Sequence, residues 1–182
     1  MNPQAAAGNL ELLPAAEHPD LLPDPVRAAL PAGAWVAAID PDLADTQALV
    51  EATGAPLDAS ANCVLVAGRR DGEERVAACV VLADTRADVN GAVRRALGVR
   101  KASFLPVERA VAESGMEFGG ITPVGLPASW RLLVDTRVAR ADWVLIGSGL
   151  RRSKLVVRGA DVAALPGAEV VDLHLPAPTT AP

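Results

Sequence analysis

The sequence predicts a single domain of the mixed α/β (α+β) class, with strands and helices alternating along the chain. Its 182 residues suit one hydrophobic core, and a 51% share of hydrophobic residues is enough to fill that core. Short apolar runs bounded by Gly, Pro and Asp switch between strand-like and helix-like spacing, which is typical of interleaved strands and helices. We expect residues 1–20 to form an N-terminal extension, residues 21–174 the domain and residues 175–182 a disordered tail, because both ends are rich in Ala and Pro.

In the first half of the domain, turn or cap residues mark the ends of the predicted elements. These elements are a helix at 21–30, a strand at 33–40, a helix at 40–54 and two strands at 62–68 and 75–83. Asp40 is the expected N-cap of the second helix, with Pro41 in its first turn and Gly54 just after its end. Asp71 and Gly72 between the last two strands favour a tight turn, so we predict a β-hairpin.

The second half continues the alternation around one glycine-rich loop. Its predicted elements are helices at 88–98, 106–115 and 160–165, and strands at 101–105, 131–135, 141–147, 154–158 and 168–175. Asp88 and Gly98 are expected to bound the first helix, and Pro106 to start the next. The segment 117–130 holds three glycines and two prolines, which predicts a loop with special backbone geometry.

The charges are unevenly distributed, although the net charge of −5 by itself disfavours a nucleic-acid binder. Residues 1–83 carry 4 basic and 12 acidic residues, residues 84–158 carry 13 and 7, and residues 159–182 carry none and 3. A basic middle segment is able to direct a polyanion onto one face of an acidic protein. Arginines on solvated helix faces would give the same count, so charge alone leaves both interpretations open.

Several function classes are disfavoured. No apolar run approaches the roughly 20 residues of a membrane span, and no basic region precedes the first apolar residues, so we expect neither insertion nor secretion. Cys63 and Cys79 lie in apolar runs without a CxxC pattern, which favours structural thiols and a reducing, cytoplasmic setting. His18 and His174 are far apart in the sequence, and phosphate- and dinucleotide-binding motifs are absent, so no metal and no cofactor are expected.

Two glycine-containing segments are candidates for chemistry. Backbone N–H groups in the 117–130 loop are able to bind a phosphate, a carboxylate or a developing oxyanion, but a structural turn has the same composition. Gly147, Ser148 and Gly149 form a second such loop, in which Leu150 breaks the GxSxG pattern of a nucleophile elbow. Lys154 follows this loop closely enough to reach the same cavity. Asp135 ends an apolar strand and either lies near the loops or caps a turn.

Residues 35–174 resemble the YbaK/EbsC superfamily of aminoacyl-tRNA deacylases, which also occurs as the editing insertion of bacterial prolyl-tRNA synthetases. The matching stretches are residues 78–104, GGITPVG at 119–125, LLVD at 132–135 and IGSGLRRSKL at 146–155. The loop contains the family's GxxxP element from Gly119 to Pro123. The resemblance implies a mixed, curved central sheet with helices packed around it.

The resemblance also implies hydrolysis, in trans, of the ester that joins an amino acid to tRNA, with Ala- or Cys-charged tRNA(Pro) as candidate substrates. No cofactor is needed, because the attacking water is organised by backbone groups and by the ribose of the substrate. The expected partner is the acceptor end of aminoacyl-tRNA, and the protein is expected to be a monomer or a homodimer. The candidate catalytic residues are Asn62, Gly119, Gly120, Thr122, Pro123 and Lys154. The candidate substrate-binding residues are Ile121, Gly125, Asp135, Gly147, Ser148, Gly149 and Arg151. The candidate tRNA-binding residues are Arg94, Arg95, Arg100 and Lys101.

One position departs from the family pattern, because the usual lysine before the hairpin aligns with Asn62. An amide offers two donors but no charge, so Lys154 or Arg151 would have to supply the positive charge. Two other functions stay open: a binding module that has kept the pocket but lost the chemistry, and hydrolysis of another small ester. Hydrolysis of another small ester would not explain the basic middle segment.

Overall fold

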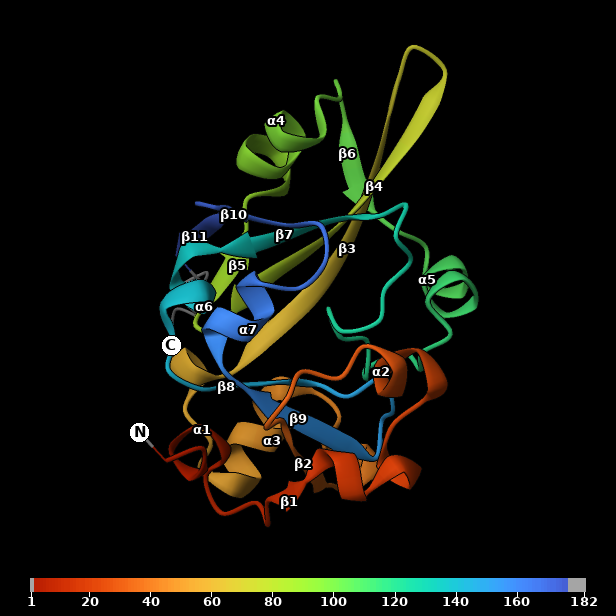
Figure 1. Ribbon diagram of the computed structural model, residues 1–182. Coiled ribbons are helices and arrows are strands. Elements are labelled where there is room, and N and C mark those ends of the chain that lie inside the picture. Colours follow the sequence, from red (N-terminus) through yellow and green to blue (C-terminus); the bar gives the residue numbers. More distant parts are fainter. Residues whose placement is uncertain (1, 177–182) are drawn as a thin grey trace.

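The computed structural model describes residues 2–176 as three β-sheets surrounded by short helices (Figure 1). The mixed α/β class predicted from the sequence is confirmed. Most of the predicted tail, residues 177–182, lies outside the described residues, whereas its first two residues belong to a strand. The described helices include no candidate for a membrane-spanning segment.

A five-stranded mixed sheet forms the upper part of the molecule in Figure 1. In spatial order its strands are β10 (Ala168–Val171), β7 (Arg131–Asp135), β4 (Glu73–Leu82), β3 (Ala61–Arg70) and β6 (Ala102–Phe104). The first three strands run parallel to one another, and β3 pairs antiparallel with both β4 and β6. Parallel and antiparallel neighbours thus occur in one sheet, and only β3 and β4 among these neighbours are joined by a tight turn.

The predicted hairpin is confirmed and is longer than expected. Strands β3 and β4 pair along ten positions, from Ala61 opposite Leu82 to Arg70 opposite Glu73. The turn residues Asp71 and Gly72 have φ angles of 53° and 85°, as a type I′ turn requires. The tip of the hairpin extends away from the rest of the molecule (Figure 1).

A four-stranded antiparallel sheet forms the lower part of the molecule. In spatial order its strands are β1 (Leu13–Pro14), β2 (Trp35–Ala38), β9 (Ser153–Val157) and β8 (Val144–Gly147). A single parallel bridge between Ser60 and Leu145 brings this sheet to the start of β3. The candidate site lies at this junction.

The single strand predicted at 168–175 is wrong, because the segment forms two strands in different sheets. β10 ends at Val171, and β11 (His174–Pro176) pairs antiparallel with β5 (Thr85–Ala87) in a separate two-stranded sheet. Leu173 between them is fully buried, and its N–H donates to the Asp135 side chain. The chain therefore turns at this point to bury Leu173 instead of continuing along β7.

The helices are short and lie around the sheets. They are α1 (Gln4–Ala7), α2 (Asp24–Ala28), α3 (Thr46–Thr53), α4 (Arg94–Leu97), α5 (Val107–Ser114), α6 (Thr136–Arg140) and α7 (Gly159–Ala163), with a π-helical turn at Val89–Val93. Within residues 2–176, 3₁₀ turns lie at Ala15–Glu17, Pro19–Leu21, Pro41–Leu43 and Leu57–Ala59.

The helix predicted at 40–54 begins later than expected. Asp40 caps only a 3₁₀ turn, whereas the Asp45 carboxylate accepts from the N–H groups of Gln47 and Ala48 and so caps α3. Gly54 ends the helix in the left-handed conformation, as predicted. Two possible capping aspartates five residues apart therefore explain the misplaced boundary.

The N-terminal residues contribute to the same packed unit as the strands. Ala6, Ala7 and Leu10 are buried in a cluster with Leu49 of α3 and Leu145 of β8. This packing places α1 against β8 of the four-stranded sheet. A domain boundary between residues 20 and 21 stays a prediction from composition.

Candidate functional site

A cavity of about 230 Å³ lies where β3, the four-stranded sheet and the 117–121 loop meet. Five of the residues singled out from the sequence line it: Asn62, Gly119, Ile121, Gly147 and Lys154. They come from four separate segments of the chain, which the fold brings together at the junction between the two larger sheets.

Lys154 supplies a positive charge to this cavity. Lys154 is only 6% exposed to solvent, and its ammonium group donates to the carbonyl of Ala44 at 2.9 Å. Burial lowers the pKa of Lys154 from 10.5 to about 8. The negative charge of Asp45 acts to raise this pKa, and the positive charge of Arg151 acts to lower it further. Lys154 is therefore mostly protonated at neutral pH and loses its charge in mildly alkaline solution.

Asn62 is oriented by a residue that the sequence did not single out. The hydroxyl of Thr46, at the start of α3, donates to Asn62 Oδ1 over 2.7 Å. This bond leaves both amide N–H donors of Asn62 without an acceptor among the described residues. The cavity lining thus includes one cation, Lys154, one oriented neutral donor, Asn62, and the Asp45 carboxylate that caps α3.

Backbone hydrogen bonds join the two glycine-containing loops at the cavity wall. The N–H of Gly149 donates to the carbonyl of Gly120 at 2.7 Å, and the N–H of Glu117 donates to Gly149 at 2.9 Å. A Cβ atom on Gly147 would lie 2.4 Å from the Gly120 oxygen, which is too close for any other residue. Glycine is therefore required at position 147 for the two loops to be in contact. Gly120 and Gly149 take part in this contact but are not among the residues that line the cavity.

Arg151 and Ser148 have structural partners. The guanidinium of Arg151 donates to the carbonyls of Phe118 and Pro41, each at 3.1 Å, and so ties two loops together. The buried hydroxyl of Ser148 contacts the hydroxyl and the carbonyl of Ser153. Neither side chain lines the cavity, so the predicted contacts of these residues with substrate have no support in this geometry.

The second half of the GxxxP loop lies behind the cavity wall. Thr122 and Pro123 are buried, and Pro123 and Gly125 line a separate hollow. Gly125 has a φ angle of 81°, and a Cβ atom there would lie 2.2 Å from the carbonyl oxygen of Pro25. These three predicted residues therefore shape the loop without reaching the cavity, and within the described residues the Thr122 hydroxyl has no partner.

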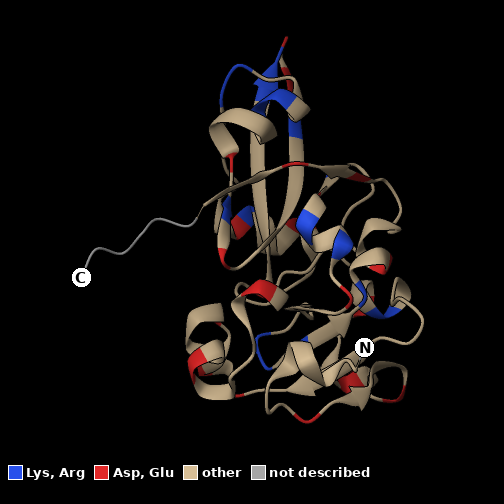
Figure 2. Cartoon of the chain, turned by 90° about the vertical axis from the view of Figure 1, so that its left-hand side faces the viewer, with Lys and Arg blue, Asp and Glu red and all other residues tan. Residues whose placement is uncertain are grey.

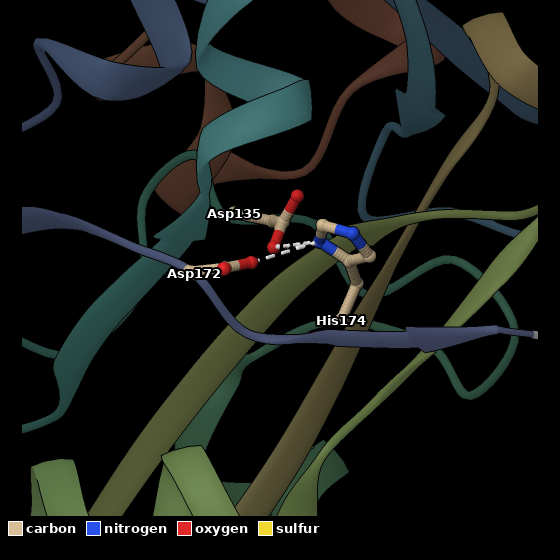
Figure 3. A group of neighbouring side chains, drawn as sticks. All are labelled: Asp135, Asp172 and His174. Atoms are coloured by element: carbon tan, nitrogen blue, oxygen red, sulfur yellow. Dashed lines mark hydrogen bonds and ion pairs between the residues drawn. The ribbon is translucent and has the colours of Figure 1, made fainter.

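Asp135 lies elsewhere, in a cluster with Asp172 and His174 (Figure 3). Its carboxylate caps α6 through the N–H of Arg137 and accepts from His174 Nδ1 at 3.0 Å, which in turn lies 3.1 Å from Asp172. The expected role of Asp135 near the glycine loops is corrected: the residue joins β7 to the segment before β11. The three potential ligand atoms lie within 4.8 Å of one another, but each already faces a partner in the cluster.

The predicted tRNA-binding residues lie at the other end of β3. Arg94, Arg95 and Arg100 line a hollow beside the tip of the hairpin, and Lys101 is exposed next to it. Figure 2 shows basic segments gathered around this end of the molecule. These residues are thus separate from the cavity: the hollow that they line lies at the end of β3, at Arg70, and the cavity lies at its start, at Asn62.

Sequence reasoning assigned no site role to the other cavity residues, among them Asp45, Thr46, Cys63 and Phe118. The first two were assigned to the interior of a helix, and the capping potential of Asp45 was the signal that could have placed them correctly. Burial raises the pKa of the Cys63 thiol and that of Cys79, the latter to about 12, so both thiols stay protonated at neutral pH. Phe118 is 58% exposed at the edge of the cavity.

Comparison with known proteins identifies the family. Residues 40–165, more than two thirds of the chain, match the model of the aminoacyl-tRNA editing domain. A crystal structure of a proposed trans-editing enzyme for prolyl-tRNA synthetase superposes with a TM-score of 0.70 at 22% identity, covering 91% of this chain and 99% of that one. A hypothetical protein gives 0.67 at 21% identity, covering 77% and 90%. These likenesses support the fold, and the family match confirms the resemblance seen in the sequence. The chain belongs to the aminoacyl-tRNA editing domain family.

Proposed function

We propose that this protein hydrolyses, in trans, the ester bond between an amino acid and the 3′-terminal ribose of a tRNA. The observation that carries the proposal is the small cavity in which the Lys154 ammonium and the Asn62 amide lie beside the 119–121 loop. An ester needs no strong nucleophile from the protein, provided that a water is positioned and the developing charge is stabilised. Family membership supports the same assignment.

In the proposed mechanism, water adds to the carbonyl carbon and the carbonyl oxygen becomes an oxyanion. The C–O bond to the ribose then breaks, and the proton lost by the water passes to the ribose oxygen. Lys154 stabilises the negative charge, and the amide of Asn62 donates to the substrate ester or to a ribose hydroxyl. The N–H groups of Gly119 and Ile121 have no acceptor among the described residues, which leaves them for solvent or substrate.

Lys154 is proposed to take over the role of the lysine that the family resemblance implies at Asn62. The two residues lie on different strands but line the same cavity, so a charge from β9 reaches the space that a lysine on β3 would reach. A buried ammonium is costly to the fold, and such groups are concentrated at functional sites. This cost supports a role for Lys154 beyond packing.

The size of the cavity favours a small amino acid. A volume of about 230 Å³ is below the ~300–1,000 Å³ of pockets that hold drug-sized ligands. Alanine and cysteine esters, with short side chains, suit this space. Leu49, Cys63 and Leu145 contribute apolar side chains to its lining.

The test is single-turnover deacylation of tRNA(Pro) charged with Ala, Cys or Ser by the wild-type protein, Lys154→Met and Asn62→Lys. We expect wild type to hydrolyse at least one ester and Lys154→Met to be slower by roughly 10²–10³-fold, the effect of removing one electrostatic stabiliser. Leu155→Met, a change of similar volume at the neighbouring buried position, is the matched control and should keep the wild-type rate. Equal rates for wild type and Lys154→Met would contradict the mechanism.

Asn62 favours one second candidate, a binding module that has kept the pocket without the chemistry. In that case the wild-type protein is inactive on all three esters, yet binds charged tRNA more tightly than uncharged tRNA. Recovery of hydrolysis by Asn62→Lys would then show that the missing charge at this position had abolished activity.

A further inference from the structure

A second hollow, of about 330 Å³, lies beside the hairpin tip, and we call it the arginine hollow. Arg70 of β3, Arg94 and Arg95 of α4, and Arg100 line it, together with one acidic residue, Asp71. Four positive charges face one negative charge in this space. This excess is unexpected on a chain whose net charge is −5.

The arginines from the α4 side have no protein partners to neutralise them. Arg94, Arg95 and Arg100 are exposed and form no hydrogen bond or ion pair among the described residues. Residues 89–107 contain four basic residues and no acidic one. Arg70 differs, because it donates to the carbonyl of Gly98 and so holds the end of α4 beside the hairpin.

The acidic residues near the hollow pair with basic residues other than Arg94, Arg95 and Arg100. Glu74 is paired with Arg109 at 2.9 Å, and Asp71 forms an exposed ion pair with Arg70 at 3.4 Å, whereas Glu73 is exposed at the hairpin tip. The cluster of arginines around α4 therefore retains its positive charge. Guanidinium groups bind phosphate oxygens in bidentate geometry, so a phosphodiester backbone is the ligand that this chemistry favours.

Strand β3 connects the arginine hollow to the cavity and fixes their separation. Asn62 and Arg70 are eight residues apart on one continuous strand, which at ~3.3 Å per residue is about 26 Å. About four stacked nucleotides, the unpaired 3′ end of a tRNA, span only ~14 Å at ~3.4 Å each. With the ester in the cavity, the arginine hollow therefore lies beyond the unpaired end, beside the acceptor-stem duplex.

The space between the two sites is open and contains an exposed aromatic side chain. A hollow of about 680 Å³ has Asn62 and Phe104 in its lining, and the chain from Gly98 to Phe104 borders this hollow and the arginine hollow in turn. Phe104 is 68% exposed. Exposed aromatic rings stack on unpaired bases without strong preference for sequence. An unpaired 3′ end is thus able to leave the cavity past Asn62 and continue past Phe104.

We propose that the arginine hollow binds backbone phosphates of the acceptor-stem duplex while the ester occupies the cavity, an inference that rests on the proposed function. Arg94, Arg95 and Arg100 bind phosphates and therefore do not distinguish base pairs. Phe104 contacts the unpaired end. The hollow makes the protein prefer substrates with a duplex over short single-stranded ones.

The test compares two aminoacyl substrates, an acceptor-stem minihelix and a short oligonucleotide that carries only the unpaired 3′ end. Arg94→Gln, Arg95→Gln and Arg100→Gln should each raise KM for the minihelix by roughly three- to tenfold, with kcat unchanged. Each should also lower the slope of log affinity against log salt by about 0.9. The oligonucleotide should be hydrolysed at the wild-type rate by all three variants. Arg140→Gln is the matched control and should behave as wild type, because Arg140 is exposed on α6, which packs near the end of β4 that is opposite the hairpin tip.

Phe104→Ala tests the contact with the unpaired end separately from the contact with the duplex. It should raise KM for both substrates, because both contain the unpaired 3′ end. Equal losses on both substrates in the arginine variants, or no loss on either, would overturn the inference while leaving the proposed function intact. If the wild-type protein hydrolyses neither substrate, the proposed function fails, and binding of uncharged minihelix measured by fluorescence anisotropy decides the inference alone. Identical salt slopes for wild type and the triple arginine variant would then refute it.

Discussion

Lys154→Met separates the cost of the buried charge to the fold from its benefit to the site. A pKa of about 8 in place of 10.5 corresponds to about 3 kcal/mol against the charged form in the folded protein. Methionine has a similar length and no charge, but it leaves the Ala44 carbonyl without its donor, at a cost of about 1–3 kcal/mol. At pH 7 we therefore expect the free energy of unfolding to be unchanged or to rise by up to about 2 kcal/mol, while deacylation is lost.

The pH dependence gives the sharper result. Between pH 8 and 10.5 the unfolded wild-type chain keeps the lysine proton that the folded protein has released, so this group raises the free energy of unfolding as pH rises. Cys63 and Cys79 act in the opposite direction above pH 9, because their raised pKa values keep them protonated only in the folded state. Both proteins contain these thiols, so the difference between wild type and variant isolates Lys154.

Urea unfolding followed by far-ultraviolet circular dichroism at pH 7, 8, 9 and 10 measures this difference. We expect the variant's advantage to shrink steadily above pH 8 as wild-type Lys154 loses its charge. A variant less stable than wild type by more than about 2 kcal/mol at pH 7, or a difference that does not change with pH, would refute the argument that Lys154 is buried as a charged group. Above pH 8, the rate of wild-type deacylation, corrected for spontaneous hydrolysis, should decrease with pH. The decrease should approach tenfold per pH unit as the protonated fraction of Lys154 declines.

Three further predictions concern the elements that build the site. Gly147→Ala should lower the free energy of unfolding by about 1–3 kcal/mol, measured by urea denaturation, because the new Cβ would lie 2.4 Å from the Gly120 oxygen; wild-type stability would contradict the tight loop contact. Thr46→Val should slow deacylation without changing the melting temperature by more than a few degrees, because Asn62 loses its orienting hydrogen bond; an unchanged rate would remove Asn62 from the mechanism. Asp135→Ala should cost about 2–4 kcal/mol through the lost α6 cap and the unpaired buried N–H of Leu173, and hydrogen exchange at that amide should accelerate; unchanged exchange would show that the carboxylate does not hold it.

The sequence predicted best those features that depend on local chemistry. The hairpin followed from Asp71 and Gly72, and the ends of α3 and α4 from Gly54 and Gly98, because left-handed backbone is almost confined to a few residue types. The helix α6 was missed, since five residues after a strand give no periodic pattern. The break after β10 was missed as well, because burial of Leu173 depends on contacts distant in sequence.

The site was predicted in part for the same reason. The glycine loops and Lys154 carry recognisable residue types, and the structure brings Gly119, Gly147 and Lys154 together. Thr46 was indicated only indirectly, through the capping potential of Asp45, and Phe118 carries no such signal, because its place in the cavity depends on how the 117–121 loop packs against β3. Asp135 shows the converse: a strand-end carboxylate has the same sequence pattern whether it contacts a substrate or caps a helix.

Glycine at two positions of the cavity wall has a consequence for how such a pocket changes in evolution. At Gly119 and Gly147 the wall is main chain: Gly119 has a left-handed φ of 85°, which disfavours other residues, and a Cβ atom on Gly147 would collide with the carbonyl of Gly120. Substitution at these two positions cannot tune the pocket without straining the backbone or breaking the contact between the loops. A lineage that acquires a new amino-acid preference is therefore restricted to the side chains of the lining, such as Leu49, Cys63 and Leu145, whose volumes can change together.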